Sequence, residues 1–199
     1  SPSHRDPTRW YNEDDPLFVW AAVDALSFVT GYSYDLNSAP VSTPDDIPET
    51  TETSTQIYHV DDGTWYFHIK AKDGAGNWSE PAHYKMNIDT SPPPKPTLVL
   101  KDLTTGSTQY TNDRTVKVEV GNDETDVVAW LISETQKTQP EEDDPLWSGE
   151  QPTTFTLTTP GDGLKTVYIW VKDGAGNINK GAKEITVNMS GPTPRTETV

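Results

Sequence analysis

The chain of 199 residues contains no cysteine. This absence excludes disulfide bridges, thiolate zinc sites and cysteine nucleophiles, and it leaves the redox compartment open because an extracellular protein can do without bridges. Long apolar runs are also missing, so we expect no segment to insert into a membrane. Basic residues are scarce, with 15 Lys and Arg against 31 Asp and Glu, and the formal charge is -16. Such a charge opposes binding to nucleic acid phosphates and to anionic lipids.

Aliphatic side chains are few, because hydrophobic residues make up only 32% of the chain, yet aromatic residues reach 10%. A core can therefore be built from a small number of large rings. The length fits one or two domains, and two modest domains fit best. Because the sequence opens with Ser1-Pro2-Ser3 and lacks both an initiator Met and a signal-like start, we expect it to be a piece of a larger protein.

An internal repeat divides the sequence. The segment Lys72–Asn77 (KDGAGN) recurs unchanged as Lys172–Asn177, and each copy lies between two runs of alternating polarity. Between the copies, the prolines of the segment 89–96 cannot continue a central strand and favour a stiff spacer. We place the domain boundary at residue 94, which gives domains 1–94 and 95–199.

Alternation of period two predicts strands throughout, and helical patterns are nearly absent. In the run 65–72, one parity faces the core with Trp65, Phe67, Ile69 and Ala71, and the other faces outward with Tyr66, His68, Lys70 and Lys72. The repeat sets Val167, Ile169 and Val171 inward and Tyr168, Trp170 and Lys172 outward. The other expected strands are 17–22, 29–36, 54–60, 82–89, 96–103, 114–121, 127–133, 153–159 and 183–188. The fold class is all-β, with two tandem immunoglobulin-like β-sandwiches of about seven strands each.

The residues also resemble known families. Trp20, Gly31–Tyr34 and Gly63–Asp73 resemble strands B, C and F of a fibronectin type III module, although Trp65 takes the place of the corner tyrosine. The first domain is similar to Ig-like modules of bacterial and archaeal surface proteins, and the second resembles bacterial Ig-like repeats through Trp130–Ser133 and the run that ends in DGAGN. The resemblance implies a sandwich fold and an extracellular or cell-surface setting, and this fold hosts many functions.

The DGAGN segment is a turn in our interpretation. Gly74 and Gly76 permit positive φ, Asp73 can accept from amides two residues on, and Asn77 tolerates the left-handed region. The alternative is a phosphate-binding loop. Such a loop should open a helix, and no helical pattern follows either copy, so the turn is favoured.

Catalytic patterns are missing. His68 and His83 both face outward and are expected to be neighbours on a solvated face, where two surface histidines are favoured over a two-histidine metal site. Carboxylate pairs such as Asp14-Asp15 lie in loops where nothing raises a pKa for general acid catalysis. No G-x-S-x-G pattern marks a nucleophilic serine. We therefore predict that the segment is not an enzyme.

Calcium is the one candidate cofactor. In a tandem of sandwiches, the loops at the end of one domain meet the B–C and F–G loops of the next. Carboxylates at such a joint could supply the six to eight oxygen ligands that calcium needs. Ordinary solvated loop residues are the favoured alternative. The candidate ligands are Asp14, Asp15, Asp61, Asp62, Asp89, Asp123 and Asp126.

Outward aromatic rings could stack on sugars. Tyr168 and Trp170 are the only candidates that share one strand at a spacing suited to a platform. Packing against lysine stems or a folded-over loop is favoured over sugar binding. The sequence therefore predicts a non-catalytic spacer, stalk or presentation unit of an extracellular multidomain protein, whose partners are neighbouring domains. The alternative is an accessory carbohydrate-binding or adhesive module that binds a polysaccharide or a protein.

Overall fold

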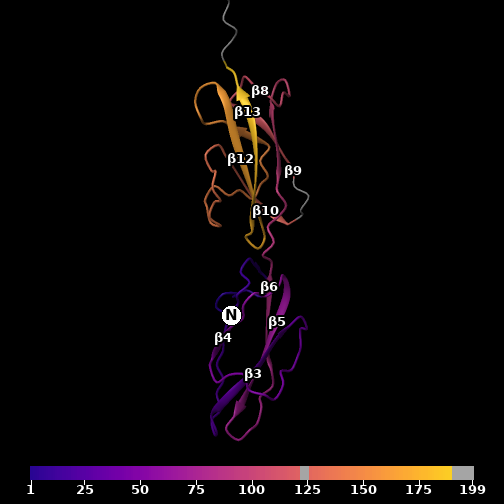
Figure 1. Ribbon diagram of the computed structural model, residues 1–199, viewed down its shortest axis with the longest axis vertical. Coiled ribbons are helices and arrows are strands. Elements are labelled where there is room, and N and C mark those ends of the chain that lie inside the picture. Colours follow the sequence, from indigo (N-terminus) through magenta and orange to yellow (C-terminus); the bar gives the residue numbers. More distant parts are fainter. Residues whose placement is uncertain (122–125, 190–199) are drawn as a thin grey trace, which may run out of the picture. The chain divides into compact units, whose positions relative to one another are not determined.

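The computed structural model describes residues 1–121 and 126–189, and these residues form strands, turns and loops but no helix. The chain divides into two compact units, Ser1–Ser91 and Pro92–Val199 (Figure 1). In the segment that joins the units, the carbonyl of Pro93 accepts a hydrogen bond of 2.9 Å from Asn179 Nδ2 of the second unit. Within the described ranges, nothing qualifies as a membrane-spanning helix.

The first unit is a two-layer sandwich. Its strands are β1 (Trp10–Tyr11), β2 (Leu17–Val19), β3 (Val29–Asn37), β4 (Ser54–Gln56), β5 (Gly63–Asp73) and β6 (Ala82–Ile88). One sheet has the order β1-β6-β5-β3, and the other contains only β2 and β4. All pairs are antiparallel except β1 with β6.

The second unit has a fuller set of strands. They are β7 (Thr97–Asp102), β8 (Tyr110–Thr111), β9 (Thr115–Gly121), β10 (Val127–Ser133), β11 (Thr154–Thr156), β12 (Gly163–Asp173) and β13 (Ile178–Val187). They form the sheets β10-β12-β13-β8 and β11-β9-β7. The prediction of tandem all-β sandwiches is confirmed. The sequence analysis missed β1 and β8, because strands of two residues are too short to show alternation.

Equivalent positions in the two units can be read from the hydrogen bonds. Gly63 pairs with Ile88, and Gly163 pairs with Val187, so β5 corresponds to β12 and β6 to β13. Trp20 N donates to Thr53 O at 3.0 Å, as Val118 N donates to Thr153 O at 2.8 Å. Strand β2 is therefore the equivalent of β9, and Trp20 stands at the position of Val118.

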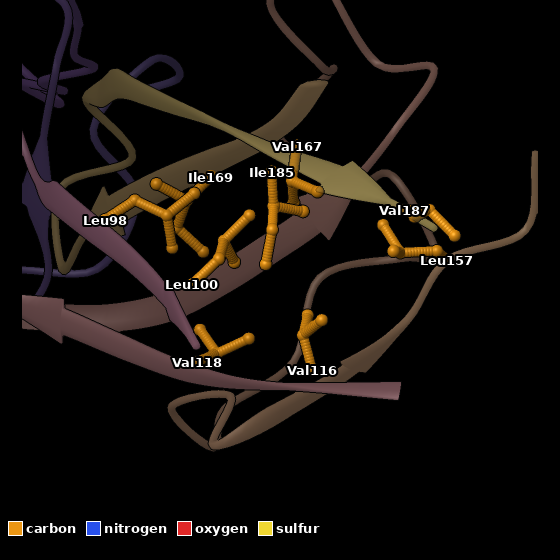
Figure 2. Packing of buried hydrophobic residues seen from close by; sticks show 9 residues of the cluster. All are labelled: Leu98, Leu100, Val116, Val118, Leu157, Val167, Ile169, Ile185 and Val187. Atoms are coloured by element: carbon orange, nitrogen blue, oxygen red, sulfur yellow. The ribbon is translucent and has the colours of Figure 1, made fainter. Parts of the chain in front are cut away.

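The two cores differ in composition. The second core is aliphatic and consists of Leu98, Leu100, Val116, Val118, Leu157, Val167, Ile169, Ile185 and Val187 (Figure 2). The first core is built from Phe18, Val60, Phe67, Met86 and Ile88, and half-buried aromatic residues pack around it. Trp20 and Trp65 belong to this surrounding layer, as their inward parity predicts.

Candidate functional site

The repeated DGAGN segment forms the same turn in both units. Asp73 Oδ1 accepts from the amides of Ala75 at 2.9 Å and Asn77 at 2.8 Å. Asp173 Oδ1 accepts from Ala175 at 3.0 Å and from Asn177 at 2.8 Å. The bond from the Asn77 side chain, followed by those from backbone amides, lowers the pKa of Asp73. The aspartate is thus the acceptor that closes the turn, as the sequence predicted.

Two details of this turn differ from expectation. Positive φ occurs at Gly76 (95°) and Gly176 (103°), whereas Gly74 and Asn77 have ordinary negative φ. Asn77 instead donates through Nδ2 to Asp73 Oδ2 at 2.9 Å. One glycine in the left-handed region is sufficient here, because the aspartate and asparagine side chains cross-link the remaining residues.

The acids before β2 are brought together with a histidine that the sequence analysis did not select. Asp15 Oδ1 accepts from the His59 amide at 2.9 Å, and Asp14 Oδ2 lies 3.6 Å from His59 Nδ1. Ligand atoms of these three side chains lie within 4.8 Å of one another. His59 has a φ of 57°, and its contacts with Asp14 and Asp15 hold the segment between β4 and β5 against the start of β2.

Two further candidate ligands of the first unit, Asp62 and Asp89, accept hydrogen bonds from the segment that follows β6. Asp62 Oδ1 accepts from the amide of Thr90 at 2.8 Å, and Asp62 Oδ2 accepts from Ser91 Oγ at 2.7 Å. The Thr90 amide, ahead of the Ser91 hydroxyl, lowers the pKa of Asp62. Asp89 Oδ1 accepts from the Ser91 amide at 3.1 Å, and the carbonyl of Asp61 accepts from Trp65 Nε1 at 2.8 Å. These contacts give the carboxylates of Asp62 and Asp89 a structural role, whereas Asp61 contributes its backbone carbonyl.

The remaining candidate calcium ligands belong to the second unit. Asp126 is exposed, and Asp123 lies outside the described residues. The calcium site inferred from the sequence draws on both units and stays a prediction. Its test is the melting temperature of the full chain, which should rise in millimolar calcium relative to chelator, because binding to the folded state alone stabilises that state.

The aromatic pair on β12 is covered by a loop and a lysine. Trp170 is only 4% exposed, and its Nε1 donates to the carbonyl of Gln136 at 2.9 Å. Lys180 Nζ lies 4.9 Å from the centre of the Trp170 ring and 5.7 Å from that of Tyr168. In this arrangement the two rings form no open platform for a sugar, and the packing interpretation is the one that the geometry supports.

His68 and Lys70 on the outer face of the first unit are covered in the same way, which corrects the expectation of a solvated face at His68, whereas His83 is exposed as expected. His68 is fully buried and Lys70 is 5% exposed, because the segment after β3 folds over them. Asn37 Oδ1 lies 3.2 Å from His68 Nε2, and Asp46 Oδ1 accepts from Lys70 Nζ at 2.5 Å. Parity predicted the direction of these side chains correctly, but a folded-over segment shields them from water.

His68 and His83 are cross-strand partners, as predicted. Their Nδ1 atoms lie 2.7 Å apart, a distance at which one ring donates to the other. Burial, and then the neighbouring His83, lower the pKa of His68. Both effects disfavour the protonated form of His68 in the folded unit.

Comparisons with known proteins address the fold alone. No family model and no curated protein matches the chain. The fibronectin(III)-like modules of CbhA from Clostridium thermocellum are 11% identical, with 90% of this chain and 86% of that chain covered and a TM-score of 0.45. The D00-D0 domain of intimin is 10% identical, with 89% and 94% covered and a TM-score of 0.35.

A third solved structure is SGBP-B of Bacteroides ovatus in complex with a mixed-linkage heptasaccharide. It is 15% identical, with 90% of this chain and 41% of that chain covered and a TM-score of 0.24. The strand order of each unit itself defines the class. One sheet holds β3, β5 and β6 (β10, β12 and β13 in the second unit), which correspond to strands C, F and G. The facing sheet holds β2 and β4 (β9 and β11), which correspond to strands B and E. The chain is a tandem of immunoglobulin-like, fibronectin type III-like β-sandwiches.

Proposed function

We propose that the chain is a non-catalytic spacer or presentation unit of an extracellular or cell-surface multidomain protein, with neighbouring domains as its partners. The observation that carries this proposal is the use of the polar and aromatic candidates in internal packing. Asp73 closes a turn, Asp62 holds the segment after β6, Lys70 pairs with Asp46, and the Trp170 indole is bonded to a loop. Side chains engaged in this way stiffen a module and leave few groups for chemistry.

The separate cores support the same proposal. Each unit buries its own cluster of apolar side chains, and the linking segment contains Pro92, Pro93, Pro94 and Pro96. Prolines restrict the backbone and favour an extended connection. A spacer requires modules that fold independently and a link that resists collapse.

Two measurements test this function. Residues 1–91 and 92–199, expressed separately, should each unfold in one cooperative thermal transition. A panel of soluble polysaccharides should leave the tryptophan fluorescence of the full chain unchanged. A half without a transition would contradict independent modules, and saturable quenching by one polysaccharide would favour a binding function instead.

The carbohydrate-binding or adhesive alternative has one specific observation in its favour. The loop after β2 exposes apolar side chains, with Val23 97%, Leu26 94% and Phe28 80% exposed. A cavity of about 240 Å³ beside this loop is lined by Lys72, Trp78 and other residues. If a polysaccharide binds here, Trp78→Ala should abolish binding, whereas Trp147→Ala in the second unit should leave binding unchanged.

A further inference from the structure

Two histidine side chains meet across neighbouring strands on the outer face of the first unit. His68 of β5 pairs in register with His83 of β6, and Asp35 of β3 stands opposite His68 on the other side. Residues directly opposite each other on neighbouring strands project from the same face of the sheet. The row therefore brings two imidazole rings and a carboxylate to one face, with the Nδ1 atoms of the two rings 2.7 Å apart.

The tautomer of His68 is determined by Asn37. Asn37 Oδ1 accepts from the backbone amide of Ala39 at 2.8 Å, which identifies this atom as the oxygen of the side-chain amide. The same oxygen lies 3.2 Å from His68 Nε2, so Nε2 carries the hydrogen of the neutral ring. His68 Nδ1 is then the nitrogen with the lone pair, and it faces His83.

Metal-binding histidines have this arrangement. Such a histidine coordinates with one ring nitrogen and donates the hydrogen of the other to a carbonyl or a carboxylate, which fixes the orientation of the ring. The amide of Asn37 takes that role for His68, and it is itself held by Asp35, whose Oδ2 accepts from Asn37 Nδ2 at 2.6 Å. Because His68 is also fully buried, its ring has little freedom to turn away.

His83 supplies the second nitrogen from the solvent side. It is exposed, so an ion can reach the pair from water and the His83 ring can turn to admit it. Zinc–nitrogen bonds of about 2.0–2.1 Å at tetrahedral angles place two ligand nitrogens about 3.4 Å apart. This is a modest opening of the present 2.7 Å. The hydrogen on His83 Nδ1 moves to Nε2 by exchange with water, so each neutral ring offers one lone pair.

The donor atoms select the class of ion. Imidazole nitrogens suit Zn²⁺, Cu²⁺ and Ni²⁺, whereas Ca²⁺ and Mg²⁺ prefer oxygen ligands. Among the described residues, no third His, Asp or Glu joins His68 and His83 in a group whose ligand atoms all lie within 4.8 Å of one another. Water would therefore complete the coordination of the ion.

We propose that His68 and His83 bind a divalent transition-metal ion through their Nδ1 atoms, with Asn37 as a positioning residue. The ion would join β5 to β6 and stabilise the first unit. In the second unit the equivalent positions are Tyr168 and Ala182, which pair in the same register and offer no imidazole. The site goes beyond the role of a spacer and does not depend on it.

The test is a titration of ZnCl₂ into the chelator-treated, ¹⁵N-labelled full chain. Long-range proton–nitrogen spectra distinguish Nδ1 and Nε2 in each of the four histidines. We expect the Nδ1 resonances of His68 and His83 to shift saturably, while the resonances of His4 and His59 stay in place. CaCl₂ at the same concentrations should move none of them. Absence of a saturable shift at His68 and His83, or a shift confined to His59, would overturn the proposal.

Matched histidine variants assign the ligands. His83→Gln removes one ligand at an exposed position and should abolish the saturable shift of His68. His59→Gln is the control at another exposed histidine, and it should bind zinc as the original chain does. Melting curves in chelator check that both variants fold. An unchanged zinc affinity in a folded His83→Gln chain, or a loss of affinity in His59→Gln, would overturn the proposal.

A second pair of variants tests the positioning role of Asn37. Asn37→Ala removes the acceptor that fixes the His68 tautomer, so zinc affinity should fall about 10–100-fold, the usual cost of losing an outer partner of a ligand. Asn37→Asp keeps an acceptor and should retain binding. Nitrogen chemical shifts without zinc separate positioning from folding, because Asn37→Ala alone should move the His68 hydrogen from Nε2 towards Nδ1. Equal zinc affinities in all three chains would exclude the positioning role.

Discussion

The two units share a strand order and a turn, but they fill their cores in different ways. The second unit packs branched aliphatic side chains around Leu98 and Leu100 of β7. The first unit packs aromatic rings instead, with Phe18 stacked on Phe67 at 4.0 Å and Tyr84 edge-on to Phe18 at 6.4 Å. A few large rings bury as much apolar surface as a larger number of aliphatic side chains. The comparison shows that one strand order accommodates cores of different composition.

The largest expected effect concerns β7. Residues 104–199, which lack this strand, should not fold, because Val116 and Val118 lose the layer that covers them. Residues 92–199 and residues 1–91 should each fold. Near-ultraviolet circular dichroism during heating would distinguish the three fragments. A cooperative transition for residues 104–199 would show that the second core does not depend on β7.

Substitution of single core side chains by alanine should have the next largest effect on stability. Phe67 is 3% exposed and lies in the centre of the aromatic cluster, so Phe67→Ala should destabilise the first unit by about 3–5 kcal/mol. Leu100→Ala should destabilise the second unit by about 2–5 kcal/mol. Trp65→Ala should destabilise less than Phe67→Ala, since Trp65 is half-buried. Denaturant unfolding of each unit measures the three values, and a smaller loss at Phe67 than at Trp65 would contradict the assigned core.

The repeated turn offers a matched pair of glycines. A Cβ on Gly74 would lie 2.3 Å from the carbonyl of Ser27, whereas a Cβ on Gly174 would meet nothing within 4 Å. Gly74→Ala should therefore destabilise by about 1–3 kcal/mol through overpacking. Gly174→Ala should be neutral or stabilise by about 0.4–1 kcal/mol, because alanine restricts the unfolded chain. Similar changes in both units, measured by thermal unfolding, would contradict this difference.

The smallest expected effect depends on pH. All four histidines lie in the first unit, and the pKa of His68 is lowered by burial and by His83. Because the unfolded histidine binds a proton more readily, the first unit should lose stability as pH falls below about 6.5, down to the folded pKa. The second unit should show no such loss in this range. His68→Gln should flatten the pH dependence of the first unit's melting temperature, and an unchanged slope would exclude His68 as its source.

Much of the fold could be predicted from local patterns. Alternation in the run 65–72 set the inward direction of Phe67 and Ile69, and the repeat transferred the same register to Val167 and Ile169. The boundaries of β10 were predicted without error. The strands β2 and β4 proved shorter than expected, because apolar residues such as Ile57 and Val60 pack against the core from loops. Alternation reports which side chains face inward, and it does not report whether the backbone is paired.

The candidate sites were less predictable. The sequence analysis identified Asp14 and Asp15 but not His59. The side chain of His59 lies beside the two aspartates while its own backbone has a positive φ. The sequence analysis gave His68 the correct direction and the wrong surroundings, because His68 is buried against Asn37 at the end of β3. For Trp170 the favoured packing against a lysine and a loop agrees with the geometry, but the sequence could not identify Lys180 and Gln136 as the residues that supply it.

By itself, the sequence determined the period-two strands, their register and the DGAGN turn, because these depend on neighbours within a few residues. Only the tertiary structure decided which outward side chains are covered, as His68, Lys70 and Trp170 are. That cover depends on which distant segments come to lie together. A strand's sequence records the direction of its own side chains, whereas its cover is supplied by residues elsewhere in the chain.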